Sequence, residues 1–423
     1  MALKKVRVTN FKSFKDLEPV ELGKFNVLIG ANASGKSNFI QIFKFLQDIT
    51  NSGLDNAISM QGGIEYLRNI NIGPSEKLSI NVVSDREFGL FGRKTKEGIK
   101  VYETNYEFVI MFKKRGTGFE IVKDNLTWKC NFFRLGKKKG NIIEKEKLGE
   151  GEIVISHIKG RMKIDLKSTE VQINVDDIPY LSYLGEVKLP PNTLMLEGRD
   201  LEGRDLEGRF SLPVQEIFSD ISIFDFDTKL AKKATPITGK AELEEDGSNL
   251  SIVLKNIIEN KDQKRKLINL ISDLLPFVSD LGVEKFADKS LLFKLQEKYF
   301  KKQYIPSSLI SEGTINIIAL IIALYFEKNP LTIIEEPERN IHPYLIYKMV
   351  NIMKDASEQK QIIVTTHNPE TVKNADSKDI LLVSRDKEGF STISKPADKD
   401  GIKTFIKNEI GIEELYVQSL LEV

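Results

Sequence analysis

The segment from Gly30 to Ser37 has the residues of a phosphate-binding loop. It reads Gly-Ala-Asn-Ala-Ser-Gly-Lys-Ser and fits the pattern G-x-x-x-x-G-K-[ST]. Glycines let backbone N–H groups turn toward a phosphate, Lys36 can reach the β- and γ-phosphates, and the Ser37 hydroxyl can bind Mg²⁺. A glycine turn that only caps a helix is the alternative. The candidate nucleotide-binding residues are Gly30, Asn32, Ala33, Ser34, Gly35, Lys36, Ser37 and Asn38.

Two adjacent carboxylates follow an apolar run late in the chain. The run is Leu331-Thr-Ile-Ile, and Glu335 and Glu336 come directly after it. Acids at the end of a strand can place Mg²⁺ beside an attacking water. We expect Glu335 to hold the metal through water and Glu336 to polarise the nucleophilic water as general base. Taken alone, the segment also fits a buried strand that ends in a solvated acidic turn.

A histidine ends a second apolar run of the same kind. The run begins at Gln361 and delivers His367, one of only three histidines in the chain. Ligands of open α/β sheets bind at the carboxyl ends of the strands, so this position suits a catalytic side chain. A purely structural histidine is the alternative.

Ser311 and Gly313 stand directly ahead of a long apolar run that ends near Phe326. Ser311 is a natural N-cap for the helix that this run predicts, and capping is its plain explanation. The same geometry makes an anion site, because a serine hydroxyl, free backbone N–H groups and a glycine all face whatever lies beyond the helix end.

Short predicted elements position these residues. Phe25–Ile29 predicts a strand that runs into the loop, and a helix follows Ser37. Alternating apolar residues such as Tyr106 and Phe108, with Ile110 and Phe112 on the same face, predict antiparallel strands in the middle of the chain. Helices are expected at about 251–260 and 264–275.

Three features of the middle of the chain have no assigned chemistry. We expect Gly116-Thr-Gly118 to form a hairpin turn. Basic clusters at 113–115 and 137–139 fit solvated hairpin tips or contacts with a nucleic-acid backbone. A five-residue repeat, Leu-Glu-Gly-Arg-Asp/Phe, occurs three times over 196–210 and predicts an expanded surface loop.

Composition adds few constraints. Lys plus Arg (62) nearly balance Asp plus Glu (61), so any nucleic-acid surface must be a local patch. The single cysteine, Cys130, excludes an intramolecular disulfide and suits a reducing compartment. The charged start predicts no signal peptide, and no apolar run approaches the roughly 20 residues needed to cross a bilayer. We therefore expect a cytoplasmic protein without a membrane segment.

In order and spacing, these motifs resemble those of the ABC ATPase superfamily: Walker A at 30–37, a signature at 310–314, Walker B at 331–336 and a switch histidine at 367. The opening 8–14, Gly-Lys-Ser-Asn at 35–38 and Glu-Glu-Pro-Glu-Arg-Asn-Ile-His-Pro at 335–343 look like the RecF/SMC-related branch. Within it, the chain most resembles stand-alone ATPases akin to the ATPase part of the overcoming-lysogenization-defect (OLD) nucleases.

The resemblance implies an α/β fold, an ABC-type P-loop ATPase head with an antiparallel β subdomain and a helical insertion. The expected parts are a single head over 1–423 that contains a β subdomain at 77–190, a helical insertion at 212–305 and a signature, Walker B and switch-histidine lobe at 306–423. The sequence between the Walker A and signature motifs has no sustained heptad repeat, so we expect no long coiled-coil arms. The residues after 386 are fewer than the roughly 40 that a small domain needs to fold unaided, so no nuclease domain is expected there.

The same resemblance implies ATP and Mg²⁺ as cofactors, with Glu336, His367 and Lys36 as catalytic residues. Ser311 and Gly313 would bind nucleotide in trans, which implies an ATP-dependent, head-to-tail homodimer. The first Walker B acid is Glu335, where most ABC proteins have aspartate, and the usual Q-loop glutamine has only Gln61 as a candidate.

Three functions fit this pattern. The favoured one is an ATPase switch that signals to DNA or to a separate effector such as a nuclease, in genome maintenance or phage defence. The alternatives are an ATP-binding scaffold with negligible turnover that regulates a partner nuclease or toxin, and a transporter-coupled ATPase, which the RecF/SMC-like opening disfavours.

Overall fold

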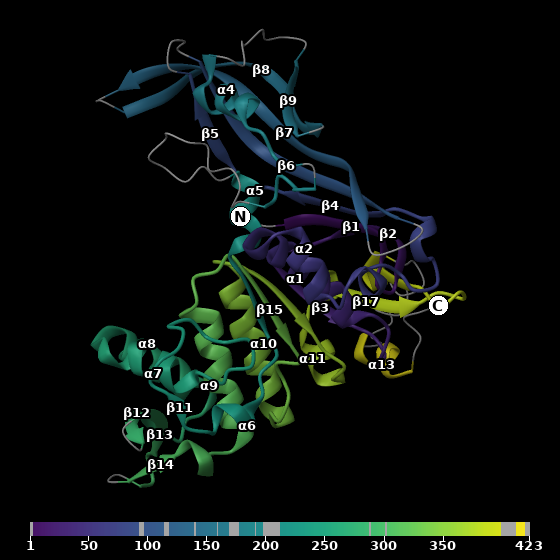
Figure 1. The fold of residues 1–423 in the computed structure, drawn as a ribbon. Helices are drawn as coiled ribbons and strands as arrows, with labels where there is room; N and C mark the ends of the chain where they lie inside the picture. The colour runs from purple at the N-terminus through teal and green to yellow at the C-terminus, as the bar shows by residue number, and fades with distance from the viewer. Residues whose placement is uncertain are drawn as a thin grey trace. The chain divides into compact units, whose positions relative to one another are not determined.

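The computed structural model divides the chain into two compact units, each with its own sheet (Figure 1). The first unit comprises Met1–Gly23, Ser37–Asp220 and Arg385–Ile393; the second comprises Lys24–Lys36, Ile221–Ser384 and Ser394–Val423. The structure describes residues 3–92, 97–113, 118–138, 141–158, 160–168, 177–190, 192–197, 212–286, 289–300, 303–398 and 412–418.

An eight-stranded antiparallel sheet forms the first unit. Its strand order is β2-β1-β4-β6-β7-β8-β9, and β5 pairs with β6. Strands β4 to β9 lie within the predicted antiparallel region at 77–190, and β1 and β2, from the start of the chain, extend the sheet beyond that prediction. The strands are β1 (Leu3–Phe11), β2 (Phe14–Glu21), β4 (Leu78–Ser84), β5 (Phe88–Phe91), β6 (Glu97–Phe112), β7 (Phe119–Lys138), β8 (Asn141–Ile158) and β9 (Arg161–Lys167).

One face of β6 is buried, as the alternation predicts: Tyr106, Phe108, Ile110 and Phe112 are all in the core. Asp124 of β7 is fully buried with them and accepts hydrogen bonds from the Tyr106 hydroxyl (2.8 Å) and the Met195 N–H (2.8 Å). Burial raises the pKa of Tyr106 well above its usual value, so Tyr106 stays a neutral donor to this carboxylate.

One long helix and several short ones accompany this sheet. They are α2 (Leu54–Met60), α3 (Ile64–Leu67), the 3₁₀ turn η1 (Gly73–Ser75), α4 (Pro179–Glu186), α5 (Pro213–Ser219) and α1 (Lys36–Ser52), of which all but Lys36 belongs to this unit. Several predicted features lie largely outside the described residues: the repeat beyond Glu197, the turn at 116–118 and parts of both basic clusters.

The second unit is built on five parallel strands in the order β10-β15-β16-β3-β17, so their carboxyl ends meet at one edge. These strands are β10 (Ile221–Phe224), β15 (Leu331–Glu335), β16 (Gln361–Thr365), β3 (Phe25–Ile29) and β17 (Ile380–Arg385). A sixth strand, β18 (Ser391–Ser394), follows β17 in the sheet order, and its residues up to Ile393 belong to the first unit.

The apolar run at 315–326 forms a helix in the core of the second unit, as predicted. This helix, α9, spans Glu312–Tyr325, and every residue from Thr314 to Leu324 is buried. The other helices of the unit are α6 (Thr228–Ala231), α7 (Leu250–Glu259), α8 (Lys261–Leu274), α10 (Pro343–Ser357), α11 (Pro369–Asn374) and α13 (Ile412–Val417), with 3₁₀ turns η3 (Ser307–Leu309), η4 (Ser377–Asp379) and η5 (Pro396–Asp398).

The segment 212–305, expected to be a helical insertion, is not purely helical. It contains α7 and α8, within a few residues of the predicted helices, but also strands of a small antiparallel sheet in the order β11-β13-β12, with β14 paired to β13. The reason is that β12 and β13 pair over most of their length, while β12 packs on α7 and α8 and β13 packs on α7. The strands are β11 (Thr235–Pro236), β12 (Val278–Phe286), β13 (Ser290–Glu297) and β14 (Tyr304–Pro306).

Candidate active site

The glycine-rich segment forms a tight loop between β3 and α1, as predicted. Gly30, Ala33 and Gly35 have φ values of 153°, 62° and 119°. A Cβ on Gly30 would lie 2.2 Å from the carbonyl oxygen of Val383, so packing as well as conformation requires glycine there. Helix α1 begins at Lys36, directly after the loop.

Lys36 folds back over this loop. Its Nζ donates to the carbonyl oxygens of Gly30 (2.8 Å) and Ala31 (3.0 Å). Burial lowers the pKa of the Lys36 ammonium, while the charges of Glu336 and Glu335 act in the opposite direction. The cation expected to contact phosphate is therefore half-buried and within the field of both Walker B acids.

Glu336 and His367 meet at the carboxyl edge of the parallel sheet. Glu335 ends β15 and pairs in register with Thr365 of β16, so the residues after each strand emerge side by side. His367 Nδ1 lies 2.7 Å from Glu336 Oε1. The N–H of Glu336 donates to the Thr365 carbonyl oxygen (3.0 Å), and its φ of 45° is unusual for a residue other than glycine.

The start of α9 has the predicted N-cap. Ser311 Oγ accepts a hydrogen bond from the Thr314 N–H (3.3 Å). Gly313 lies against the loop after Walker B, because a Cβ there would be 2.4 Å from the carbonyl oxygen of Asn340. Capping accounts for Ser311 within this chain, and a role of both residues in a second subunit stays a prediction.

Three predicted residues belong to the first unit. Ser37 and Asn38 form the start of α1, and Asn38 Nδ2 donates to Ser13 Oγ (2.8 Å). Gln61 follows α2 and is buried. Its proposed Q-loop role stays a prediction.

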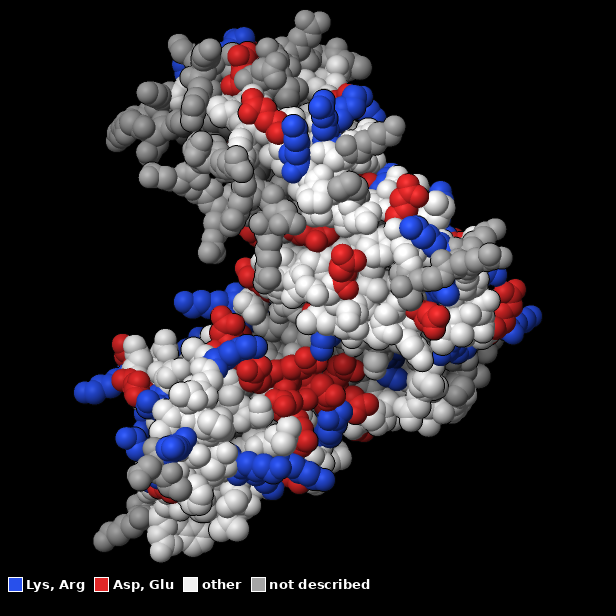
Figure 2. All heavy atoms as spheres, viewed as in Figure 1, with Lys and Arg blue, Asp and Glu red and all other residues white. Residues whose placement is uncertain are grey.

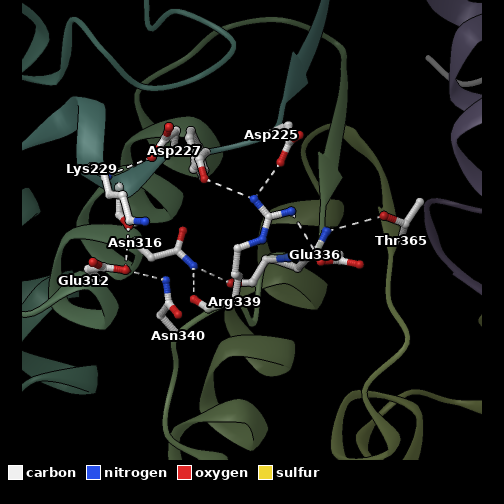
Figure 3. A network of polar contacts seen from close by, with 12 residues as sticks. Asp225, Asp227, Lys229, Glu312, Asn316, Glu336, Arg339, Asn340 and Thr365 are labelled. Atoms are coloured by element: carbon white, nitrogen blue, oxygen red, sulfur yellow. Dashed lines mark hydrogen bonds and ion pairs between the residues drawn. The ribbon is translucent and has the colours of Figure 1, made fainter. Parts of the chain in front are cut away.

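Sequence reasoning assigned no role to three residues that surround Glu336. Glu338 is buried, accepts a hydrogen bond from Thr366 Oγ1 and has a pKa raised by burial. Arg339 contacts Glu336 directly, and Asn316 of α9 holds the backbone between them (Figure 3). The sequence shows the run Glu-Pro-Glu-Arg after Glu335, but no local pattern in it indicates which side chain contacts Glu336.

A magnesium ion would fit this edge. The described residues hold no group of three or more His, Cys, Asp and Glu side chains arranged to bind a metal on their own. Mg²⁺ does not require one, because proteins typically bind it through one or two side chains together with phosphates and waters. Glu335 at the end of β15 has the right donor chemistry, and the assignment of Glu335 and Ser37 as metal ligands stays a prediction.

The parallel sheet, the loop after β3 and the acids after β15 define an ABC-type P-loop ATPase head, of mixed α/β fold with a large antiparallel sheet. The chain belongs to the family described as "AAA domain, putative AbiEii toxin, Type IV TA system", whose model matches residues 25–151 and 196–373. The finer resemblance to OLD ATPases stays a prediction.

One curated relative and several solved structures resemble parts or all of this chain. A stretch of 103 residues is 33% identical to the "Chromosome partition protein Smc" of Fusobacterium nucleatum, but the match covers 23% of this chain and 8% of that protein. Matched solved structures include an Smc head bound to the C-winged helix domain of ScpA (16% identity, 95% of this chain and 100% of that one, TM-score 0.47) and the SMC head domain from Thermotoga maritima (15%, 93% and 99%, 0.41).

The surface carries charge unevenly despite a net charge of +1. Figure 2 shows a dense patch of acidic side chains on the face in view, with Lys and Arg side chains at its border. Such a patch repels a phosphate backbone. None of the helices in the described part of the chain has the length and apolar character needed to span a membrane.

Proposed function

We propose that this protein binds and hydrolyses ATP. The observation that carries the proposal is the 2.7 Å contact between His367 and Glu336 at the edge where β3 also delivers the loop. Lys36 and the loop N–H groups bind the phosphates, and Glu335 and Ser37 hold Mg²⁺. Glu336 takes the proton of the attacking water, and His367 orients its carboxylate.

Hydrolysis drives a dimeric switch in this proposal. Ser311 and Gly313 of one subunit complete the nucleotide site of the other in a head-to-tail homodimer. ATP closes the dimer and hydrolysis opens it, so a partner that prefers one state senses the nucleotide. Support comes from the family match and from the N-cap at Ser311, whose hydroxyl lies at the start of a long helix.

In this proposal the protein and its partner act in the cytoplasm, in genome maintenance or in phage defence. The family description names a putative toxin and a type IV TA system, which supports a defence role. The separate effector, such as a nuclease or toxin, is proposed from the resemblance of the sequence motifs. DNA is the other partner to test, and it would have to bind away from the acidic patch.

Mg²⁺-dependent ATP hydrolysis, measured together with mass by light scattering, tests the proposal. We expect turnover by the wild type and, for Glu336→Gln, loss of turnover with an ATP-bound dimer that persists. Glu284→Gln, which changes an exposed glutamate paired with Lys294 on the small sheet, is the matched control and keeps activity. DNA is added in a parallel series, and stimulation identifies it as a partner.

A second candidate function is an ATP-binding scaffold that regulates a partner with negligible turnover. The observation in its favour is Glu335, a longer acid at the position where most ABC proteins have aspartate. ATP binding without measurable hydrolysis in both the wild type and Glu336→Gln would replace the first function with this one. Absence of both binding and hydrolysis would contradict the two proposals together.

A further inference from the structure

Arg339 joins the ends of two neighbouring strands through one guanidinium group (Figure 3). Its Nη1 donates to Asp225 Oδ1 (2.9 Å) and to the carbonyl oxygen of Phe226 (3.4 Å). Its Nη2 donates to Glu336 Oε2 (3.3 Å). The planar fork of arginine can serve such separated acceptors at once, which a lysine ammonium cannot do with the same geometry.

The sheet explains why these groups meet. Strands β10 and β15 pair in parallel with Phe224 opposite Ile334, so Asp225 and Glu335 follow at the same edge. Arg339 returns to this edge through a tight turn, in which its N–H donates to the carbonyl oxygen of Glu336 (3.0 Å). The carboxylate of Asp225, directly after β10, therefore lies where the guanidinium of Arg339 can pair with it.

Helix α9 holds the backbone of this turn through hydrogen bonds. Asn316 is 2% exposed, and its Nδ2 donates to the carbonyl oxygens of Pro337 (3.0 Å) and Arg339 (2.7 Å). Asn340 Nδ2 donates to Glu312 Oε2 (2.9 Å). With its backbone tied to α9, Arg339 has little freedom to follow Glu336 if that side chain moves.

The carboxylate of Glu336 is consequently held at both oxygens. His367 engages Oε1 and Arg339 engages Oε2. One contact would leave the carboxylate free to rotate about its terminal bond, whereas two contacts on different oxygens set its plane. The backbone cannot compensate easily, because Glu336 has a left-handed φ of 45° and its N–H is bonded to Thr365.

We propose that Arg339 is a positioning residue, anchored by Asp225, that orients the Glu336 carboxylate toward the attacking water. The inference rests on the proposed hydrolysis by Glu336. The ion pair of Arg339 and Asp225 contributes little to folding, because their side chains are 42% and 49% exposed and solvent screens exposed pairs. Its contribution lies in geometry, so the pair acts on the rate rather than on stability.

Steady-state ATP hydrolysis of single and double variants tests the inference. Arg339→Ala should lower kcat about tenfold or more with KM for ATP nearly unchanged, since a displaced general base loses part of its roughly 10²–10⁴-fold effect. Asp225→Ala should lower kcat less. The double variant should be no slower than Arg339→Ala, because Asp225 acts only through Arg339. Arg339→Lys should recover part of the rate.

Lys264→Ala is the matched control. It removes a partly exposed ion pair with Asp280 (2.8 Å) between α8 and β12, away from this edge, and should leave kcat unchanged. A wild-type kcat in Arg339→Ala, while Glu336→Gln is inactive, overturns the inference and leaves the proposed function standing. A higher kcat also overturns it, since Arg339 would then restrain the base. Additive losses in the double variant exclude Asp225 as the anchor.

A measurement that does not depend on ATP turnover distinguishes failure of the proposed function from failure of the inference about Arg339. If the wild type does not hydrolyse ATP, the proposed function fails. Histidine-labelled NMR then tests the geometry on a chain with three histidines. Ring signals of His367, assigned with His367→Ala, should shift in Arg339→Ala and Asp225→Ala but not in Lys264→Ala. Unchanged signals in both variants overturn the inference.

Discussion

Packing within the chain requires glycine at position 313, where a nucleotide contact in trans is also predicted. Gly313 lies in the first turn of α9, and a Cβ would come within 2.4 Å of the Asn340 carbonyl oxygen. Backbone cannot move aside as the end of a flexible side chain can. The glycine of the signature is therefore needed to seat α9 on the loop after Walker B, whether or not nucleotide is bound.

We expect Gly313→Ala to destabilise the second unit by about 1–3 kcal/mol, the usual cost of overpacking. The denaturation midpoint in urea, followed by circular dichroism, measures this without ATP. Gly185→Ala is the control: Gly185 lies in α4, nothing is within 4 Å of its Cβ position, and alanine is the better helix former. Equal midpoints for the two variants would contradict the packing argument.

At the scale of elements, α9 is secured at both ends. Asn316 and Ser311 act near its N-terminus, and Lys360 acts at its C-terminal end, where Nζ donates to the carbonyl oxygens of Ala323 (3.1 Å) and Glu327 (2.6 Å). The ammonium satisfies carbonyl groups that a helix end leaves without partners. Burial lowers the pKa of Lys360 to about 8.

This pKa sets a pH dependence with a definite sign. Lys360 titrates near 8 in the folded chain and near 10.5 when exposed, so between these values the unfolded chain binds more protons. Stability therefore gains with pH across that window. We expect the wild type to become more stable relative to Lys360→Met as pH rises from about 8 to 10.5, measured by urea denaturation.

The matched control is Lys255→Met, which changes an exposed lysine of α7 paired with Glu259. A stability difference between wild type and Lys360→Met that stays constant over the window would contradict the lowered pKa of Lys360. A difference that falls with rising pH would mean that the folded state binds this proton more tightly than the unfolded one.

At the scale of the whole molecule, the proposed dimer would place two nucleotide sites across one interface. In each site Lys36 comes from one subunit and Ser311 from the other. A chain that lacks either residue can still supply the other to a partner. The head-to-tail arrangement therefore makes a prediction about mixtures that a self-contained site does not make.

We expect Lys36→Ala and Ser311→Arg to be inactive as separate proteins and to recover activity when mixed. A mixed dimer pairs the intact Lys36 of one variant with the intact Ser311 of the other, which restores one of two sites. With free exchange, roughly a quarter of the wild-type ATPase rate should return. The measurement is hydrolysis against mixing ratio, with each variant mixed with itself as control. No recovery, despite dimers seen by light scattering, would contradict a site shared in trans.

The sequence by itself determined the local parts of this protein. The loop at 30–37, the N-cap at Ser311 and the strand that ends at Glu335 all follow from nearest neighbours and periodicity, and each lies where the pattern predicts. Burial of Phe108 and its neighbours on β6 follows equally from alternation. Such features depend on a few adjacent residues, so they can be inferred without knowing the fold.

Only the tertiary structure decided which distant side chains meet. Arg339 and Asp225 are 114 positions apart, and Glu336 and His367 are 31 apart. Their contacts depend on the order β10-β15-β16, which no local pattern specifies. The small sheet of β11 to β14 escaped prediction for the same reason, because strand pairing is a choice among partners across the chain. Local propensity selects elements, and packing selects the neighbours that turn those elements into a site.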